Sequence, residues 1–207
     1  NAINNGLVSF DDHRIDINIS ENQIEISDNG TGIPVDDTYS ALLDIGNSQK
    51  DYEESRGFRG IGRLGGLSFC SKLDFITSCK GEDKRSIVSF DCVKLKKLLA
   101  PGQYDDYDVI KVLEEISNLS TKKEKEDKHY FKVVMNGIDD QYDELNNRDD
   151  VTEFLSQNVP VGFHGAKFIH YRDILNYFKK NGYSLEEYNI FLDGTQIFKP
   201  YRTRFKA

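Results

Sequence analysis

Hydrophobic and polar residues alternate strictly over residues 14–20, which predicts a β-strand with one apolar face. A shorter alternating run over residues 24–27 predicts a second strand, and the Glu21-Asn22 pair between the two runs favours a turn. The two runs therefore predict a β-hairpin near the start of the chain.

The rest of the pattern predicts a mixture of strands and helices. Strands are predicted over residues 72–77, 85–91, 129–135, 188–192 and 196–198, the last two joined by an Asp-Gly-Thr hairpin turn. Helices are predicted over residues 35–43, 93–99, 107–119, 149–157 and 171–178. The charged run over residues 121–128 is predicted to be a solvated loop.

An acid stands at the end of the second predicted strand. Because side chains alternate between the two faces of a strand, Asp28 is expected on the same apolar face as Ile24 and Ile26. A carboxylate in that place is costly unless it is hydrogen-bonded. Gly30 and Gly32 follow it and leave room for a ligand to approach the backbone. Two interpretations stay open here: a polar ligand bound at Asp28, or an ordinary Asp-Asn-Gly turn.

A second unusual segment is rich in glycine. Residues 57–67 hold five glycines and follow a polar segment, residues 47–56, that is predicted to be a loop. Glycine costs roughly 1 kcal/mol relative to alanine inside a helix, so an ordinary helix is not favoured here. A helix that begins near Gly62 would direct free N–H groups toward an anion, with Arg59 and Arg63 adding positive charge. The alternative is a glycine-rich turn that packs tightly at its last two glycines.

Composition narrows the class of protein. The chain has 207 residues, of which 38% are hydrophobic and 30% charged, which is typical of a soluble globular protein of one domain or slightly more. The net charge of −8 argues against non-specific nucleic-acid binding as the main activity, although a local basic patch is compatible with it. No apolar run approaches the length of a membrane span. The three cysteines, Cys70, Cys79 and Cys92, lack metal-site spacing and favour reduced thiols in a cytoplasmic protein.

Three motifs in order carry a family resemblance. An asparagine at the end of a helix, the Asp28-x-Gly30-x-Gly32 motif, and the Gly57-x-x-Gly60-x-Gly62 motif together resemble the gyrase, heat-shock chaperone, histidine kinase and MutL (GHKL) superfamily of ATPases. The resemblance implies the α+β Bergerat fold, a two-layer sandwich in which helices cover a mixed, mostly antiparallel sheet. We expect the ATP-binding domain over residues 1–157, with its first helix incomplete, and a linker with the start of a second α+β, transducer-like domain over residues 158–207.

The resemblance also implies the ligands, ATP and Mg²⁺, and the residues that bind them. Asn1 matches the asparagine that binds magnesium and contacts the phosphates, and Asp28 matches the acid that accepts a hydrogen bond from the adenine amino group. Residues 47–56 match part of the lid that covers ATP. The full expected set of binding residues is Asn1, Asp28, Gly30, Gly32, Ile33, Lys50, Gly57, Arg59, Gly60, Ile61, Gly62 and Thr77.

Two departures from the family pattern affect the prediction. The general-base glutamate of the hydrolysing members precedes the magnesium asparagine by one helical turn, so its position falls before Asn1 and no catalytic residue is assigned. The family often has a Gly-Thr pair at the start of a late strand, and residues 128–131 lack it. Either water or Thr77 is expected to replace that threonine, and His129 is interpreted as a surface strand residue.

The glycine-rich segment is most similar to that of bacterial 90-kDa heat-shock-type ATPases and their MORC and MutL relatives. That similarity implies an ATP-binding and ATP-hydrolysing module of a chaperone-like or clamp-like protein, which closes a lid on ATP and forms a homodimer when full length. The client or partner protein is not implied. Two alternatives stay open: a nucleotide-gated interaction module that does not hydrolyse ATP, and a MutL-like clamp that processes DNA.

Overall fold

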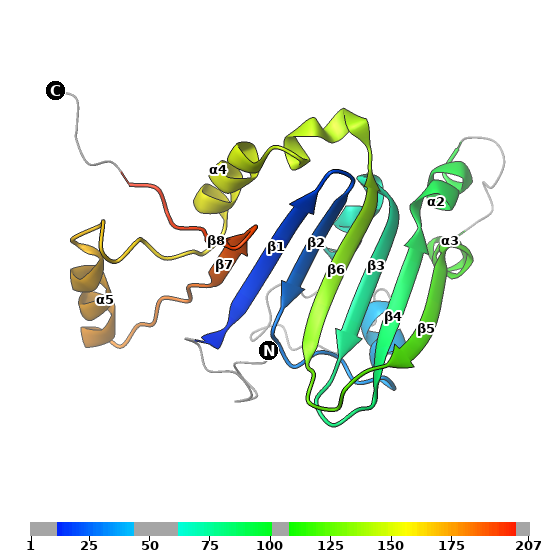
Figure 1. The fold of residues 1–207 in the computed structure, drawn as a ribbon, viewed down its shortest axis with the longest axis horizontal. Coiled ribbons are helices and arrows are strands. Elements are labelled where there is room, and N and C mark those ends of the chain that lie inside the picture. The colour runs from blue at the N-terminus through cyan, green and yellow to red at the C-terminus, as the bar shows by residue number, and fades with distance from the viewer. Residues whose placement is uncertain (1–11, 44–61, 101–107, 202–207) are drawn as a thin grey trace.

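The computed structural model describes residues 12–43, 62–100 and 108–201. Its strands form one sheet in the order β5-β4-β3-β6-β2-β1-β7-β8, and all neighbours are antiparallel except the parallel pair β1 and β7 (Figure 1). The strands are β1 Arg14–Ser20, β2 Gln23–Asp28, β3 Cys70–Ser78, β4 Lys84–Asp91, β5 Ser117–Lys123, β6 Tyr130–Ile138, β7 Asn189–Leu192 and β8 Thr195–Gln196. The mixed, mostly antiparallel sheet agrees with the predicted α+β class.

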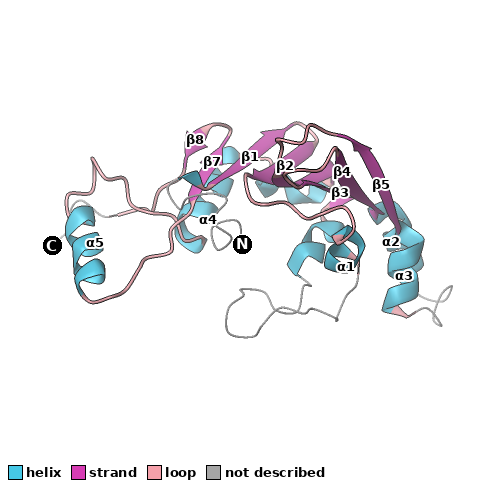
Figure 2. Ribbon diagram, turned by 90° about the horizontal axis from the view of Figure 1, so that it is seen from below, coloured by secondary structure: helices cyan, strands magenta, loops and turns pink. Residues whose placement is uncertain are grey.

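The helices are distributed unevenly around the sheet. They are α1 Thr38–Leu42, α2 Cys92–Leu98, α3 Val109–Ile116, α4 Arg148–Asn158 and α5 Tyr171–Lys180, with 3₁₀ helices η2 Gly62–Ser68 and η3 Asp140–Leu145. Figure 2 shows α1, α2 and α3 together on one face of the sheet, which we call the inner face. The fold is therefore a two-layer sandwich over this part of the sheet, as predicted.

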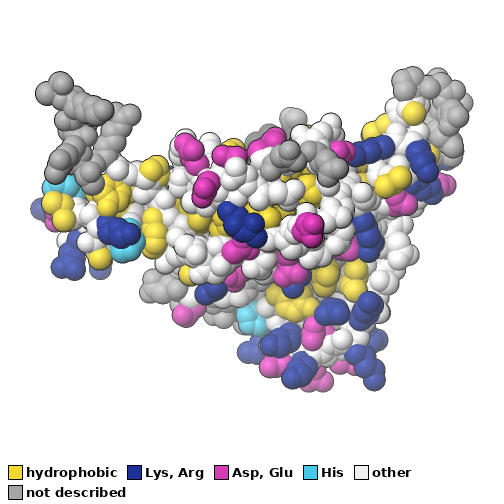
Figure 3. All heavy atoms as spheres, turned by 45° about the horizontal axis from the view of Figure 1, so that its top comes forward, with side chains coloured by type: hydrophobic (Ala, Val, Ile, Leu, Met, Phe, Trp, Pro, Cys, Tyr) yellow, Lys and Arg dark blue, Asp and Glu magenta, His cyan; other side chains and the backbone are white. Residues whose placement is uncertain are grey.

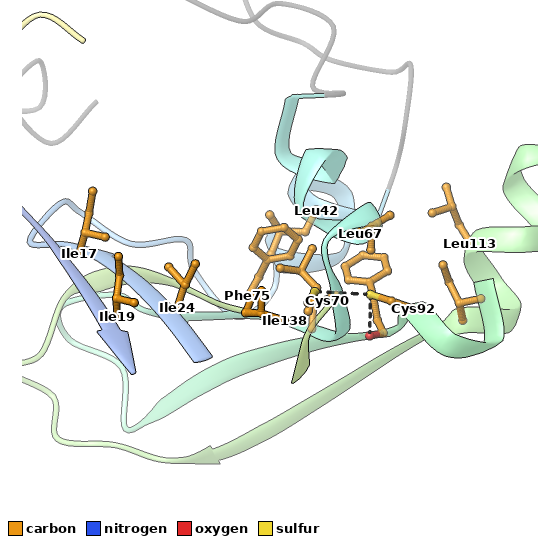
Figure 4. Close-up of a cluster of buried hydrophobic side chains, with 14 of the residues drawn as sticks. Ile17, Ile19, Ile24, Leu42, Leu67, Cys70, Phe75, Cys92, Leu113 and Ile138 are labelled. Atoms are coloured by element: carbon orange, nitrogen blue, oxygen red, sulfur yellow. Dashed lines mark hydrogen bonds between the residues drawn. The ribbon is translucent and has the colours of Figure 1, made fainter. Parts of the chain in front are cut away.

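The hydrophobic core lies between the inner face and these helices. Leu73 and Phe90 face each other in the register of β3 and β4, and both are fully buried. Leu42 from α1 and Leu113 from α3 belong to the same cluster (Figure 4). The three cysteines are free thiols, as expected. Cys70 and Cys92 lie in this core, with their Sγ atoms 3.9 Å apart. Burial of these apolar side chains holds the helices on the inner face.

The first hairpin forms as its alternating pattern predicts. Ile17 pairs with Ile26 and Ile19 pairs with Ile24, so that apolar side chains of β1 and β2 share the inner face. Ile17, Ile19 and Ile24 are buried. Except for Asp28 at the end of β2, the polar residues of the same two strands occupy the outer face, where Arg14 pairs with Asp16 at 2.7 Å.

One region differs from the prediction. The helix predicted to reach residue 119 ends at Ile116, and β5 follows it at once, so the predicted solvated loop over 121–128 is in part a strand. β5 is an edge strand that pairs only with β4, and its side chains are mostly exposed. An exposed edge strand needs no apolar alternation and often carries lysine, here Lys122 and Lys123, so the usual strand signal is missing.

The chain returns to the sheet after residue 158. β7 pairs with β1, while the Asp193-Gly194 turn joins β7 to β8 with positive φ values of 46° and 79°, as the predicted hairpin requires. α5 lies apart from the layer formed by α1, α2 and α3 (Figure 1). The division into two domains at residue 158 stays a prediction.

Charged side chains of both signs are interspersed on the face seen in Figure 3. On the outer face of the sheet, Lys132 pairs with Glu25 at 2.7 Å and Lys72 with Asp74 at 2.9 Å. Within the described ranges, the helices are all too short or too polar to span a membrane.

Candidate functional site

Asp28 is the last residue of β2 and lies on the inner face. It stands opposite Ile15 of β1 and opposite Phe131 of β6. Because Asp28 is two and four residues beyond Ile26 and Ile24, it shares their face, and the prediction from strand alternation is confirmed.

The same cross-strand row continues from Phe131 to Thr77 and Ser86, so this end of the inner face is largely polar. Thr77 and Ser86 are buried, and the Ser86 hydroxyl has no hydrogen-bond partner among the described residues. The apolar core therefore gives way to a polar edge at this end of the sheet.

Among the described residues, one carboxylate oxygen of Asp28 has no hydrogen-bond partner. Asp28 Oδ1 accepts a hydrogen bond of 2.7 Å from the backbone N–H of Gly30, and no further partner of the carboxylate is found within the described part of the chain. Burial raises the pKa of Asp28, while the hydrogen bond from Gly30 and the nearby His13 act in the opposite direction. A ligand that donates a hydrogen bond to Oδ2 would compensate the carboxylate for its lost hydration.

His13 lies beside Asp28 at the start of β1. Burial lowers the pKa of His13, and the negative charge of Asp28 partly opposes this effect. Its ring makes an edge contact with the Tyr188 ring at 5.3 Å between centroids, and its buried Nδ1 has no hydrogen-bond partner in the part of the chain that the structure describes. Sequence reasoning missed this residue, because no motif places it next to the acid.

The loop after Asp28 is held by β3 and by the residue before β6. The Thr77 hydroxyl accepts a hydrogen bond of 2.7 Å from Ile33 N–H and donates one of 3.2 Å to the Tyr130 carbonyl. His129 Nδ1 lies 2.8 Å from the Gly30 carbonyl oxygen. These contacts connect the loop to two strands that lie far from it in the sequence.

Two more contacts fix the ends of this loop. The carboxylate of Glu82, in the turn between β3 and β4, accepts a hydrogen bond of 3.2 Å from Val35 N–H. Asn29 Oδ1 accepts a bond of 2.9 Å from Arg14 N–H, and Asn29 Nδ2 donates one of 2.7 Å to the Asp12 carbonyl. The loop is therefore held in one conformation at both ends.

Gly32 is required by the protein backbone. Its φ is +69°, and a Cβ atom at this position would lie 1.8 Å from the Ser78 carbonyl oxygen. The sequence predicts that Gly32 leaves room for a ligand, but the group that approaches it in the structure is the end of β3. A side chain at this position would push the loop away from the sheet.

Thr77 and His129 have clearer roles than the sequence indicated. The single hydroxyl proton of Thr77 is donated to the Tyr130 carbonyl. A ligand could therefore bind this hydroxyl only by donating a hydrogen bond to its oxygen. The sequence favours a surface strand position for His129, whereas the structure shows it half-buried, directly before β6 and in contact with Gly30. No local signal connects two residues 99 positions apart, so only the strand register could have revealed this contact.

The glycine-rich segment is described only from Gly62, where the 3₁₀ helix η2 begins. A Cβ atom at Gly66 would lie 3.2 Å from Leu73 Cδ1, so the predicted tight packing is present at this glycine. At Gly65, no atom of the described residues would lie within 4 Å of an added Cβ. Anion binding near Gly62 stays a prediction.

Half of the predicted binding residues lie outside the described ranges. They are Asn1, Lys50, Gly57, Arg59, Gly60 and Ile61, together with the predicted lid over residues 47–56 and the incomplete first helix. The expected magnesium ligand, Asn1, is among them. Within the described residues, no three His, Cys, Asp or Glu side chains gather closely enough to hold a metal ion.

A groove of about 330 Å³ lies between α1 and the α3–β5 segment, and Asp28 does not line it. Its lining residues are Tyr39, Leu43, Ile110, Leu113, Glu114, Ser117, Asn118 and Leu119. The groove is therefore distinct from the polar end of the inner face.

Comparison with known proteins places this geometry in a family. A family model described as histidine kinase-, DNA gyrase B-, and HSP90-like ATPase matches residues 2–135. The chain belongs to this ATPase family. The matched part of the chain contains β1 to β5, most of β6, and the whole of the Asp28 loop with the residues that hold it.

One solved structure shares the fold of this chain, and a second is a weaker match. The ATPase region of Saccharomyces cerevisiae topoisomerase II matches with a TM-score of 0.51 and 15% identity, over 89% of this chain and 42% of that chain. The same region bound to ICRF-187 (dexrazoxane) matches with a TM-score of 0.46 and 18% identity, over the same shares. The chain thus spans less than half the length of these structures. No curated protein matches it.

Proposed function

We propose that this chain is the ATP-binding and ATP-hydrolysing module of a chaperone-like or clamp-like protein. Membership of the ATPase family supports the binding of a nucleotide. The arrangement at Asp28 supports the position at which its base would bind. The observation that carries the proposal is a desolvated carboxylate with one oxygen held by Gly30 and the other available to a ligand.

The base would lie at the polar end of the inner face. The 6-amino group of adenine would donate a hydrogen bond to Asp28 Oδ2, and the base would rest against the backbone of Gly30 and its neighbours. A base without a donor at that place would leave a partly buried carboxylate oxygen unpaired, which is costly. The arrangement thus favours adenine over bases with an oxo group at that position.

The phosphates would lie toward the glycine-rich segment. Backbone N–H groups of Gly57, Gly60 and Gly62 would bind phosphate oxygens, while Lys50 and Arg59 would add positive charge. Asn1 would hold Mg²⁺, which neutralises charge on the phosphates when bound. Hydrolysis by such a site depends mainly on positioning and electrostatic stabilisation.

In this proposal ATP closes the predicted lid over residues 47–56, and two copies of the full-length protein associate in the closed state. The support is the resemblance of the glycine-rich segment to the heat-shock-type members of the family. The client protein is left open, since the described surface identifies none.

The test is calorimetric titration of ATP into the protein and into Asp28→Asn, with phosphate release measured in parallel. Because Gly30 N–H would hold the oxygen of the introduced side-chain amide, the NH₂ group of that amide would face the adenine amino group, and two donors would meet. We expect ATP affinity to fall by about tenfold to a hundredfold.

The matched control is Asp16→Asn, which changes a carboxylate on the same hairpin but on the outer face. It should leave ATP affinity unchanged. Equal ATP affinity in folded Asp28→Asn and in the unchanged protein would contradict the assignment of the base to Asp28.

A further inference from the structure

We propose that His129 is a positioning residue that orients Asp28 through the backbone of Gly30, and so sets the selectivity of this site for a ligand with a hydrogen-bond donor. The proposal rests on the proposed function, because it assumes that the ligand is a nucleotide whose base meets Asp28. Nothing in the motifs of the sequence assigns this role to His129.

The connection runs through two hydrogen bonds. His129 Nδ1 lies 2.8 Å from the Gly30 carbonyl oxygen, and Gly30 N–H donates to Asp28 Oδ1 at 2.7 Å. A carbonyl oxygen can only accept, so Nδ1 of His129 carries a proton and donates it. His129 therefore holds Gly30, and Gly30 in turn holds one oxygen of Asp28.

Gly30 needs such a support from outside its own segment. A glycine has no side chain to restrict its φ and ψ, so its peptide groups turn more freely than those of other residues. If Gly30 turned, its N–H would leave Asp28 Oδ1, and the carboxylate would lose its orientation. The hydrogen bond from His129 restricts that motion at the carbonyl end of Gly30.

His129 is itself held by a rigid element. It directly precedes Tyr130, the first residue of β6, and β6 lies between β2 and β3 in the sheet. Phe131 stands opposite Asp28 in that register, and its ring stacks on Phe75 at 5.9 Å. The donor is thus placed from the strand adjacent to Asp28, which limits its movement relative to the carboxylate.

The other contacts of the loop do not perform the same task. Thr77 holds Ile33 and Glu82 holds Val35, both several residues beyond Asp28. Only His129, among the described residues that hold this loop from the neighbouring strands, contacts the glycine that donates to Asp28. A role in orientation therefore predicts an effect on base selectivity, whereas a role in loop stability predicts a general loss of binding.

The experiment compares the unchanged protein with His129→Ala, His129→Asn and His170→Ala. Asparagine places an amide NH₂ near the position of Nδ1, so it can restore the bond to Gly30. His170, before α5, provides a matched control outside the site. Titrations with ATP and with inosine triphosphate, which has an oxo group in place of the 6-amino group, measure the two affinities.

We expect His129→Ala to weaken ATP about tenfold and to leave inosine triphosphate unchanged, because the latter gains nothing from Asp28. His129→Asn should recover most of the ATP affinity, and His170→Ala should match the unchanged protein. In the Asp28→Asn background, His129→Ala should cause no further loss of ATP affinity. Without nucleotide, the Gly30 amide should exchange its hydrogen faster in His129→Ala.

Equal ATP affinity in His129→Ala and the unchanged protein would overturn the proposal. An equal loss for ATP and inosine triphosphate would also overturn it, since that result indicates general loosening of the loop. Failure of the proposed function is distinguishable: the unchanged protein would then bind neither nucleotide, and the role of His129 in selectivity would fall with it.

Discussion

At the scale of single residues, Asp28 is the proposed ligand contact, and its partial burial also lowers the stability of the folded protein. It ends a strand whose other inner-face residues are isoleucines, and burial raises its pKa. Its hydrogen bond from Gly30 offsets part of the lost hydration. A residue of this kind serves ligand binding and lowers the stability of the ligand-free protein.

The pH dependence of stability follows from this shift. A carboxyl group whose pKa is higher in the folded state binds its proton more tightly there, so stability falls as pH rises from 3.8, its ordinary value, through the folded-state pKa. We expect Asp28→Asn to be more stable than the unchanged protein at pH 7 without nucleotide. The difference should vanish below pH of about 3, where both states are protonated.

Denaturant unfolding at a series of pH values measures this effect, with Asp16→Asn, on the outer face of the same hairpin, as the control. A stability difference that stays constant from pH 3 to 7 would show that ionisation of Asp28 is not its cause.

Gly32 gives a second residue-scale prediction. Gly32→Ala would place a Cβ 1.8 Å from the Ser78 carbonyl oxygen at a φ of +69°, so we expect it to destabilise the protein by about 3 kcal/mol or more. Gly81→Ala is the matched control, because its φ is +92° but an added Cβ would meet no atom of the described residues within 4 Å. It should cost only about 1–2 kcal/mol. Equal losses in free energy of unfolding would contradict the steric explanation.

At the scale of elements, the loop after β2 is placed by β3, by the β3–β4 turn and by the residue before β6. Thr77→Val removes the acceptor of Ile33 N–H while keeping the shape of the side chain. We expect ATP affinity to fall by about threefold to tenfold and the Ile33 amide to exchange faster. Thr77→Ser keeps the hydroxyl and should bind ATP nearly as well as the unchanged protein. Unchanged binding by the valine variant would show that this contact does not shape the site.

The sequence predicts those helices and strands that bury one face in the core and expose the other to solvent. Strict alternation places β1 and β2 and puts Asp28 on the correct face, because one face packs on the core and the other meets solvent. β5 is missed, since an exposed edge strand carries no such pattern. The contact of His129 with Gly30 is missed for a different reason: it depends on the register of β6 with β2, which no local pattern encodes.

At the scale of the whole molecule, the sheet connects the two parts of the chain that the sequence divides at residue 158. Asp193, in the β7–β8 turn, accepts a hydrogen bond of 2.9 Å from Ile19 N–H and pairs with Arg148 of α4 at 2.6 Å. Arg148 in turn donates to the Ile19 carbonyl at 2.7 Å. The strand that pairs with the Asp28 strand is thus also bonded to the segment that follows the proposed ATP-binding domain.

In the proposed function, Asp28 accepts a hydrogen bond from a donor group on the base of a nucleotide. The most direct test of this claim is the ratio of affinities for ATP and inosine triphosphate, measured by calorimetry in the unchanged protein and in Asp28→Asn. We predict a preference for ATP that Asp28→Asn reverses, because the new amide NH₂ would donate to the oxo group. An identical ratio in the two proteins would contradict the claim.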